Sequence, residues 1–133
     1  MLKVPTFLGS SAITDAGLGL FAGRAIKKGE VIWQFDERVD RLLTVATVES
    51  LPLPAREFVY HYGSQCREDL WLLCGDNARF VNHGVPGVMA CDLGDHLDAE
   101  DIALRDVEVG EEITEDYGRF ALDFQRRGFY HKS

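Results

Sequence analysis

"ARFVNHGVPG", residues 78–87, breaks the apolar pattern of the sequence on either side of it. The segments "DLWLLCG" (69–75) and "GVMACDL" (87–93) are apolar enough to be buried strands. Between them stand an amide, Asn82, and an imidazole, His83, followed by two glycines around a proline, which suit neither a helix nor a strand. Such a turn between two core strands is either a hydrogen-bonded core pair or part of a binding site.

Further short strands are predicted along the chain. The segment "GLGLFAGRAI" (17–26) is entered through glycines, "KKGE" (27–30) is a turn, and "EVIWQFD" (30–36) carries apolar side chains on both alternating faces. Toward the C-terminus, "EDIALRDVEVGEEITEDYG" (100–118) predicts two strands joined at "VGEE". We therefore expect a mainly β fold with short helical insertions.

Two segments have helical patterns. Residues 44–63 carry apolar side chains at helical spacing, with Pro54 suited to the start of a helix and Gly63 to its end. A second helix is predicted over 119–127, where the glycine at position 128 would stop it.

Length and composition predict one domain. The chain has 133 residues, of which 46% are hydrophobic and 27% charged, which is enough for one compact core. No internal repeat, linker or low-complexity run divides it. We expect a single domain over 1–133, with a helical insertion at about 40–68 and a helical tail at about 119–133.

The sequence carries no targeting or metal-binding signal. No run approaches the roughly 18 apolar residues of a membrane span, and the N-terminal residues lack a signal-peptide core. We expect a soluble, intracellular, cytoplasmic protein without a membrane partner, and secretion into a host stays open. The three cysteines, Cys66, Cys74 and Cys91, form no C-x-x-C pair, so neither a disulfide framework nor a metal site is predicted.

The charge distribution bears on the partner. The net charge is −8, and residues 92–116 hold 11 of the 22 acidic residues but only one basic residue, Arg105. Direct nucleic-acid binding is disfavoured, because it depends on Lys and Arg neutralising phosphates. A basic partner fits better. The alternative is that these carboxylates are solvated residues that keep the protein soluble.

Three short motifs have ordinary explanations when taken singly. The glycines of "GLGLFA" (17–22) could serve only a close backbone approach. The segment "RFVNHG" (79–84) could be a capped turn, and "GEEITEDYG" (110–118) could simply bury a tyrosine. Together and in this order, they resemble the SET-domain family of protein-lysine methyltransferases. The resemblance spans roughly residues 10–120. Within the family, the chain resembles a free-standing minimal SET domain of bacterial or viral type. It implies a β-clip-like fold of small curled sheets, with a variable insertion and a knot-like threaded C-terminal segment.

The resemblance also implies a site for S-adenosyl-L-methionine. The backbone of His83 would pair with adenine, and the side-chain amide of Asn82 would hold the methionine end. The other cofactor-binding residues implied are the backbone of Gly17, Leu18, Gly19 and Leu20, and the packing residues Arg79 and Phe80.

For the reaction itself, the resemblance implies that Tyr117 is the catalytic residue, which orients the amine or the methyl group. It assigns Phe35 to the wall of the lysine channel. Alternation along "ITEDY" places Glu115 on the same side as Tyr117, whereas a local twist would turn it into solvent.

The sequence also departs from the family pattern. The turn 84–87 lacks the usual Ser and Pro-Asn, and no cysteine follows Cys91. The aromatics left to close the cofactor pocket are Phe124, Phe129 and Tyr130, which could equally anchor a terminal helix.

The predicted function is S-adenosylmethionine-dependent methylation of a lysine in a basic peptide or protein segment, with homodimerisation left open. Tyr117 favours this enzyme. The altered turn after His83 favours the alternative, a weak or inactive SET fold that serves as a peptide- or cofactor-binding module.

Overall fold

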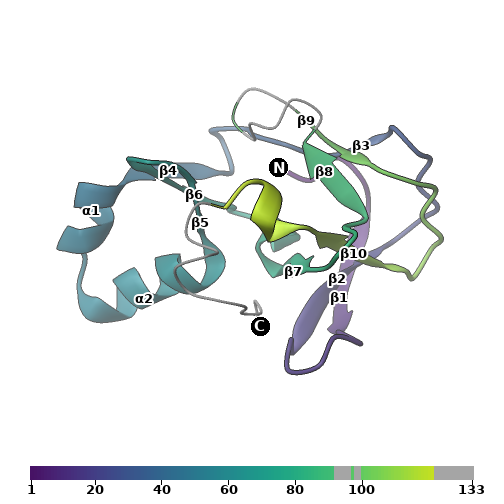
Figure 1. The fold of residues 1–133 in the computed structure, drawn as a ribbon, viewed down its shortest axis with the longest axis horizontal. Coiled ribbons are helices and arrows are strands. Elements are labelled where there is room, and N and C mark those ends of the chain that lie inside the picture. The colour runs from purple at the N-terminus through teal and green to yellow at the C-terminus, as the bar shows by residue number, and fades with distance from the viewer. Residues whose placement is uncertain (92–96, 98–99, 122–133) are drawn as a thin grey trace.

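The computed structural model describes residues 1–91, 97 and 100–121, and the account below concerns these residues. They form two sheets and two short α-helices (Figure 1). The larger sheet has the strand order β1 (Thr6–Ser10), β2 (Leu18–Ala22), β10 (Glu112–Glu115), β8 (Met89–Cys91), β9 (Glu100–Ala103) and β3 (Val31–Gln34), and β7 (Asn82–His83) pairs with β10. The smaller sheet has the order β4 (Arg41–Thr44), β6 (Leu70–Leu73) and β5 (Ser64–Arg67). The predicted mainly β fold is confirmed.

The larger sheet encloses the main core. β1 and β2 pair antiparallel from Thr6 opposite Ala22 to Ser10 opposite Leu18. Leu20 and Ala22 point into a core that also contains Ile113 of β10, and all three are fully buried. Since side chains alternate along a strand, Phe21 lies on the other face, where it stacks on Phe7 at 5.6 Å between ring centroids.

The helical insertion is confirmed, but it is two helices, α1 (Val45–Ser50) and α2 (Leu53–Tyr62). Thr44 caps α1 by accepting a hydrogen bond from the Thr47 N–H at 3.1 Å. Pro54 lies in the first turn of α2, as predicted. Gly63 caps the end of α2, as predicted, and a Cβ at this position would lie 2.7 Å from the carbonyl oxygen of Val59 and 3.1 Å from that of Leu72.

The helices pack with the smaller sheet on one side of the molecule (Figure 1). Val48 of α1, Val59 of α2 and Trp71 of β6 form their buried cluster. None of the described helices is long and apolar enough to span a membrane.

The two strands predicted in 100–118 are β9 and β10, and the turn at "VGEE" directly precedes β10. They are not neighbours in the sheet, because β8 lies between them. The chain leaves β9, forms a bridge between Val107 and Ile26, and turns at Gly110, whose φ is +82°, before β10 begins. β10 can then pair with β2 on one side and with β7 and β8 on the other.

The last described element is a 3-10 turn, η2 (Tyr117–Arg119), and the described residues end at 121. Most of the helix predicted over 119–127 lies outside the described residues, as do Phe124, Phe129 and Tyr130.

Candidate active site

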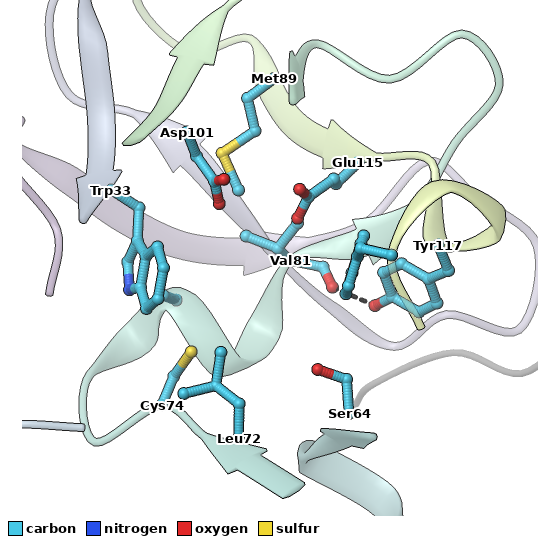
Figure 2. A pocket seen from close by; sticks show the side chains of 11 residues that line it. Trp33, Ser64, Leu72, Cys74, Val81, Met89, Asp101, Glu115 and Tyr117 are labelled. Atoms are coloured by element: carbon cyan, nitrogen blue, oxygen red, sulfur yellow. Dashed lines mark hydrogen bonds between the residues drawn. The ribbon is translucent and has the colours of Figure 1, made fainter. Parts of the chain in front are cut away.

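A cavity that is partly open to solvent lies between the two sheets (Figure 2), and the space of about 380 Å³ within its lining includes part of that open solvent. The larger sheet contributes Trp33, Asp101, Met89 and Glu115 to its lining. The smaller sheet and the segment after it contribute Ser64, Leu72, Cys74 and Ala78. Val81, Tyr117 and Phe120 complete the lining. The fold therefore assembles this cavity from residues far apart in the sequence.

One face of the larger sheet makes a continuous wall of the cavity. Trp33 of β3 lies directly opposite Asp101 of β9, and Met89 of β8 lies directly opposite Glu115 of β10. Because β3, β9, β8 and β10 are consecutive neighbours in the sheet, the four side chains lie on one face of it, with Asp101 opposite Cys91 and Met89 opposite Ala103. Glu115 is only 5% exposed, which excludes the alternative that a twist turns it into solvent.

Tyr117 stands at one side of the cavity, where the two later motifs meet. β7 runs parallel to β10, with Asn82 opposite Thr114 and His83 opposite Glu115. The Tyr117 N–H donates to Nδ1 of His83 at 3.0 Å, and the Tyr117 hydroxyl donates to the carbonyl of Val81. Tyr117 is 2% exposed. Its ring is therefore fixed by the "RFVNHG" segment, as the sequence motifs led us to expect.

The turn after His83 is packed against β10. A Cβ atom at Gly84 would lie 2.8 Å from Oγ1 of Thr114, and a Cβ at Gly87 would lie 2.8 Å from the backbone N of Asp116. Both distances are shorter than real Cβ contacts. The absence of Ser after His83 thus has a steric cause in this chain.

Asn82 links this turn to the glycine motif of β2. Its Nδ2 donates to the carbonyl of Leu18 at 2.9 Å and to Oε2 of Glu112 at 3.2 Å. The same carboxylate accepts a hydrogen bond from the Ser11 hydroxyl at 2.9 Å. Asn82 is fully buried, and its Oδ1 has no hydrogen-bond partner among the described residues. An acceptor left unpaired in this way costs free energy unless a ligand or water pairs with it.

The glycines of the first motif leave room beside Asn82. Gly17 has a φ of +73°, which a residue with a side chain rarely adopts. A Cβ at Gly19 would lie 2.6 Å from the Glu112 carboxylate and 3.3 Å from Nδ2 of Asn82. Leu18 is 40% exposed, whereas the side chain of Leu20 belongs to the core. Any ligand contact from Leu20 is therefore limited to its backbone.

Arg79 and Phe80 face the helical insertion. The Arg79 guanidinium carbon lies 5.0 Å from the ring centroid of Phe80 and 5.4 Å from that of Tyr62 in α2, which is within cation–π range. Neither Arg79 nor Phe80 lines the cavity between the sheets.

Phe35 does not line this cavity, whereas Trp33 does, so the place of Phe35 in a lysine channel stays a prediction. β3 ends at Gln34, and its pairing with β9 shifts register between Val31 and Trp33. Phe35 packs against the same apolar cluster as Trp33 but lines a separate surface hollow with residues such as Arg38. The alternation of "VIWQF" places Trp33 and Phe35 on one face of the strand.

Asp101 is the second residue that the sequence did not reveal. It is 1% exposed and lines the cavity, although it belongs to the acidic stretch that looked solvated. The sequence offers no signal that separates it from its ten acidic neighbours in 92–116. Among the described residues, no group of three or more His, Cys, Asp or Glu side chains could hold a metal ion.

Comparisons with known proteins agree with this geometry. A sequence model of the SET domain matches residues 17–118. A search of curated proteins found no significant match. Solved structures with the same fold include Polycomb Repressive Complex 2 of Chaetomium thermophilum bound to an inhibitor, at 20% identity and a TM-score of 0.70 over 93% of this chain and 17% of the other.

Two further structures give the same result. The C. thermophilum complex in an autoinhibited conformation bound to S-adenosylmethionine matches at 21% identity and a TM-score of 0.68, over 96% of this chain and 16% of that chain. An active Polycomb Repressive Complex 2 in the basal state matches at 23% identity and a TM-score of 0.65, over 86% and 15%. The chain thus spans about a sixth of the length of these proteins, and at such identities the likeness concerns the fold. Since the sequence model covers most of the chain and all three motifs, this protein belongs to the SET-domain family.

Proposed function

We propose that this protein is an S-adenosylmethionine-dependent protein-lysine N-methyltransferase that acts on a basic peptide or protein segment. The observation that carries the proposal is the position of Tyr117, which lines the cavity and is hydrogen-bonded to both Val81 and His83. SET domains are generally lysine methyltransferases, and one structure with the same fold is bound to S-adenosylmethionine.

The residues around Asn82 fit the methionine end of this cofactor. Oδ1 of Asn82 is a buried acceptor without a partner among the described residues, and an α-ammonium group is a donor that can satisfy it. The Glu112 carboxylate, 3.2 Å from Nδ2 of Asn82, adds a negative charge near that ammonium. Gly19 leaves room for this carboxylate, because a Cβ there would lie 2.6 Å from it.

The chemistry sets a clear requirement for the cavity. A lysine ammonium has a pKa near 10.4, so removing its proton at pH 7 costs roughly 4–5 kcal/mol. When bound, S-adenosylmethionine supplies an electrophilic methyl group and a positive sulfonium that disfavours a second cation beside it. A narrow cavity lined largely by apolar side chains adds desolvation and alignment of the amine.

Tyr117 is suited to orient the amine. Because its hydroxyl hydrogen is donated to the Val81 carbonyl, its oxygen is fixed and keeps a lone pair that can accept an N–H from the substrate. This fixed acceptor directs the nitrogen lone pair away from the hydroxyl and toward the methyl group. Holding two reactants in the correct orientation lowers the activation barrier of the reaction between them.

The direct test is incubation of the protein with methyl-labelled S-adenosylmethionine and a cell lysate, followed by identification of methylated residues by mass spectrometry. We expect label on lysine in a basic segment. Asn82→Ala should lose most of the transfer, and calorimetric titration should show that it has lost affinity for S-adenosylhomocysteine.

A matched titration of chelator-treated wild-type protein tests whether cofactor binding needs a metal. We expect unchanged affinity. A folded protein that binds neither cofactor form at millimolar concentration, yet retains a basic peptide, would contradict the proposal and support a binding module.

A further inference from the structure

We propose that Asp101 and Glu115 form a carboxylate pair that selects an unmethylated lysine amine and stops the reaction after one methyl group. The inference rests on the proposed lysine methyl transfer and assigns the specificity of that site. Glu115 could be suspected from the sequence, whereas Asp101 enters only through the structure.

The fold directs both carboxylates into the cavity. Asp101 comes from β9 and Glu115 from β10, and the two strands are separated in the sheet only by β8. Figure 2 shows the two carboxylates pointing into the same space, with Trp33 on one side and Tyr117 on the other. Both side chains are more than nine-tenths buried. An amine that reaches Tyr117 therefore enters a space that two carboxylates border.

The electrostatics favour a cationic ligand in this space. The cavity lining contains two carboxylates and no lysine, arginine or histidine among the described residues. Methyl transfer requires a positive sulfonium and an amine that arrives as an ammonium to come close together. Two carboxylates in a buried site help the ammonium to enter, because charges interact strongly away from water, and the sulfonium beside it then favours the loss of its proton.

Counting hydrogen-bond donors gives the specificity. A neutral primary amine has two N–H donors and one lone pair, so Tyr117 can accept one hydrogen and the carboxylate pair the other while the lone pair faces the methyl group. A secondary amine has one N–H, and if Tyr117 accepts it, the N-methyl group must lie against the carboxylate pair. The carboxylate pair then gains no hydrogen bond from the amine. The pair therefore accepts lysine and rejects monomethyllysine.

In this arrangement the methyl transfer follows the loss of a proton from the ammonium. The ammonium first releases one proton to water and becomes a neutral amine. Its lone pair then forms the new N–C bond while the C–S bond breaks and leaves its electron pair on sulfur. The products are a secondary ammonium and a neutral thioether. The secondary ammonium can release a proton, but the resulting amine has a single N–H and cannot donate to both Tyr117 and the carboxylate pair.

A cavity without the pair would show the opposite preference. Trp33 alone would attract methylated ammonium ions, because cation–π contacts do not need N–H donors. The order of preference among amines therefore distinguishes the two cases.

The activity test uses degenerate peptide pools with a fixed central lysine, monomethyllysine or dimethyllysine, and mass spectrometry of the product. Wild type should methylate the lysine pool at least about tenfold faster than the monomethyl pool, as expected for one lost charge-assisted hydrogen bond. Asp101→Val and Glu115→Leu should each reduce this ratio to within about threefold. Glu49→Gln, which changes an exposed carboxylate of α1, should keep the wild-type ratio.

Thermal unfolding checks that each variant is folded. If Asp101→Val does not fold, Asp101→Asn keeps the shape of the side chain and removes its charge. An equal rate on the lysine and monomethyl pools with wild type would overturn the proposal. An unchanged ratio in both acid variants would also overturn it.

A binding test separates this proposal from the proposed function. With S-adenosylhomocysteine present, the Trp33 indole signal in NMR is titrated with butylamine and its N-methyl, N,N-dimethyl and N,N,N-trimethyl forms. If the wild type transfers no methyl group to any peptide pool, the proposed function is wrong. The amine titration then tests the carboxylate pair by itself. Tightest binding of the primary amine, lost in both acid variants, supports the pair. A flat or reversed order overturns it.

Discussion

The side chain of Tyr117 donates its hydroxyl hydrogen to the main-chain carbonyl of Val81, a residue 36 positions earlier. The Tyr117 backbone is tied to the same segment, because its N–H donates to Nδ1 of His83 at 3.0 Å. Two contacts thus fix the phenol relative to the turn that carries Asn82. The arrangement makes one candidate site from two motifs distant in the sequence.

Replacing Tyr117 by Phe should separate catalysis from cofactor binding. The change removes one hydroxyl and little volume, so turnover should fall by about 10–1000-fold, or about 1.4–4 kcal/mol. Loss of the hydrogen bond to Val81 should cost about 1 kcal/mol of unfolding free energy. Single-turnover kinetics and titration with S-adenosylhomocysteine measure the two effects. Unaltered turnover would mean that another residue orients the amine.

Gly19→Ala and Gly29→Ala form a matched pair of glycine substitutions. A Cβ at Gly19 meets the Glu112 carboxylate at 2.6 Å, so the change should weaken cofactor binding by about tenfold or more and should alter stability little. A Cβ at Gly29 meets nothing within 4 Å, but its φ is +85°, so that change should cost about 1 kcal/mol of stability. Titration calorimetry measures the cofactor affinity of both variants, and urea unfolding measures their stability. Equal effects of both variants on affinity would argue against a cofactor cradle at Gly19.

Trp33→Phe and Phe35→Leu test which aromatic residue lines the substrate channel. Trp33 borders the cavity, whereas Phe35 packs against the same apolar cluster outside it. We expect Trp33→Phe to raise KM for a substrate peptide by about 3–10-fold, and Phe35→Leu to leave it within about twofold. Thermal unfolding of both variants controls for loss of packing. A larger KM effect from Phe35→Leu would support the assignment made from the sequence.

Glu30 provides a pH-dependent contribution to stability outside the site. The hydrogen bond from the Arg24 guanidinium, together with the Lys27 N–H, lowers the Glu30 pKa from 4.5 to about 2. Between these values the unfolded chain binds more protons at this carboxyl, so its contribution is complete above about pH 4.5 and is lost as the pH falls toward 2.

The variant Glu30→Gln should therefore lower Tm at neutral pH and low salt, and the difference from wild type should shrink on acidification through this range. Added salt should also reduce the difference, since the pair with Arg24 is exposed to solvent. Glu49→Gln should show neither dependence. Parallel Tm curves for wild type and Glu30→Gln from pH 6 to pH 2 would contradict this assignment.

The sequence alone predicted the elements whose signal is local. Alternating apolar residues indicated the strands now seen at β2, β3, β6 and β8, and helical spacing indicated the insertion that became α1 and α2. The family resemblance carried by the three motifs placed Asn82 and Tyr117 in one candidate site before the hydrogen bonds of Tyr117 to Val81 and His83 could be seen. These predictions succeed because a strand face, a helix stripe or a glycine turn is specified by neighbouring residues.

Only the tertiary structure decided which acidic and aromatic side chains enter the cavity. The sequence left Glu115 between channel and solvent and gave no reason to single out Asp101, and the family resemblance named Phe35 for the channel without considering Trp33. The outcome depends on which strands become neighbours: β8 inserts between β9 and β10, and β3 pairs with β9 after a shift in register. That pairing places Trp33 opposite Asp101, and the β8–β10 pairing places Met89 opposite Glu115, on one face. A shift of one residue in either pairing would turn these side chains away from the cavity, and no local pattern along the chain encodes that register.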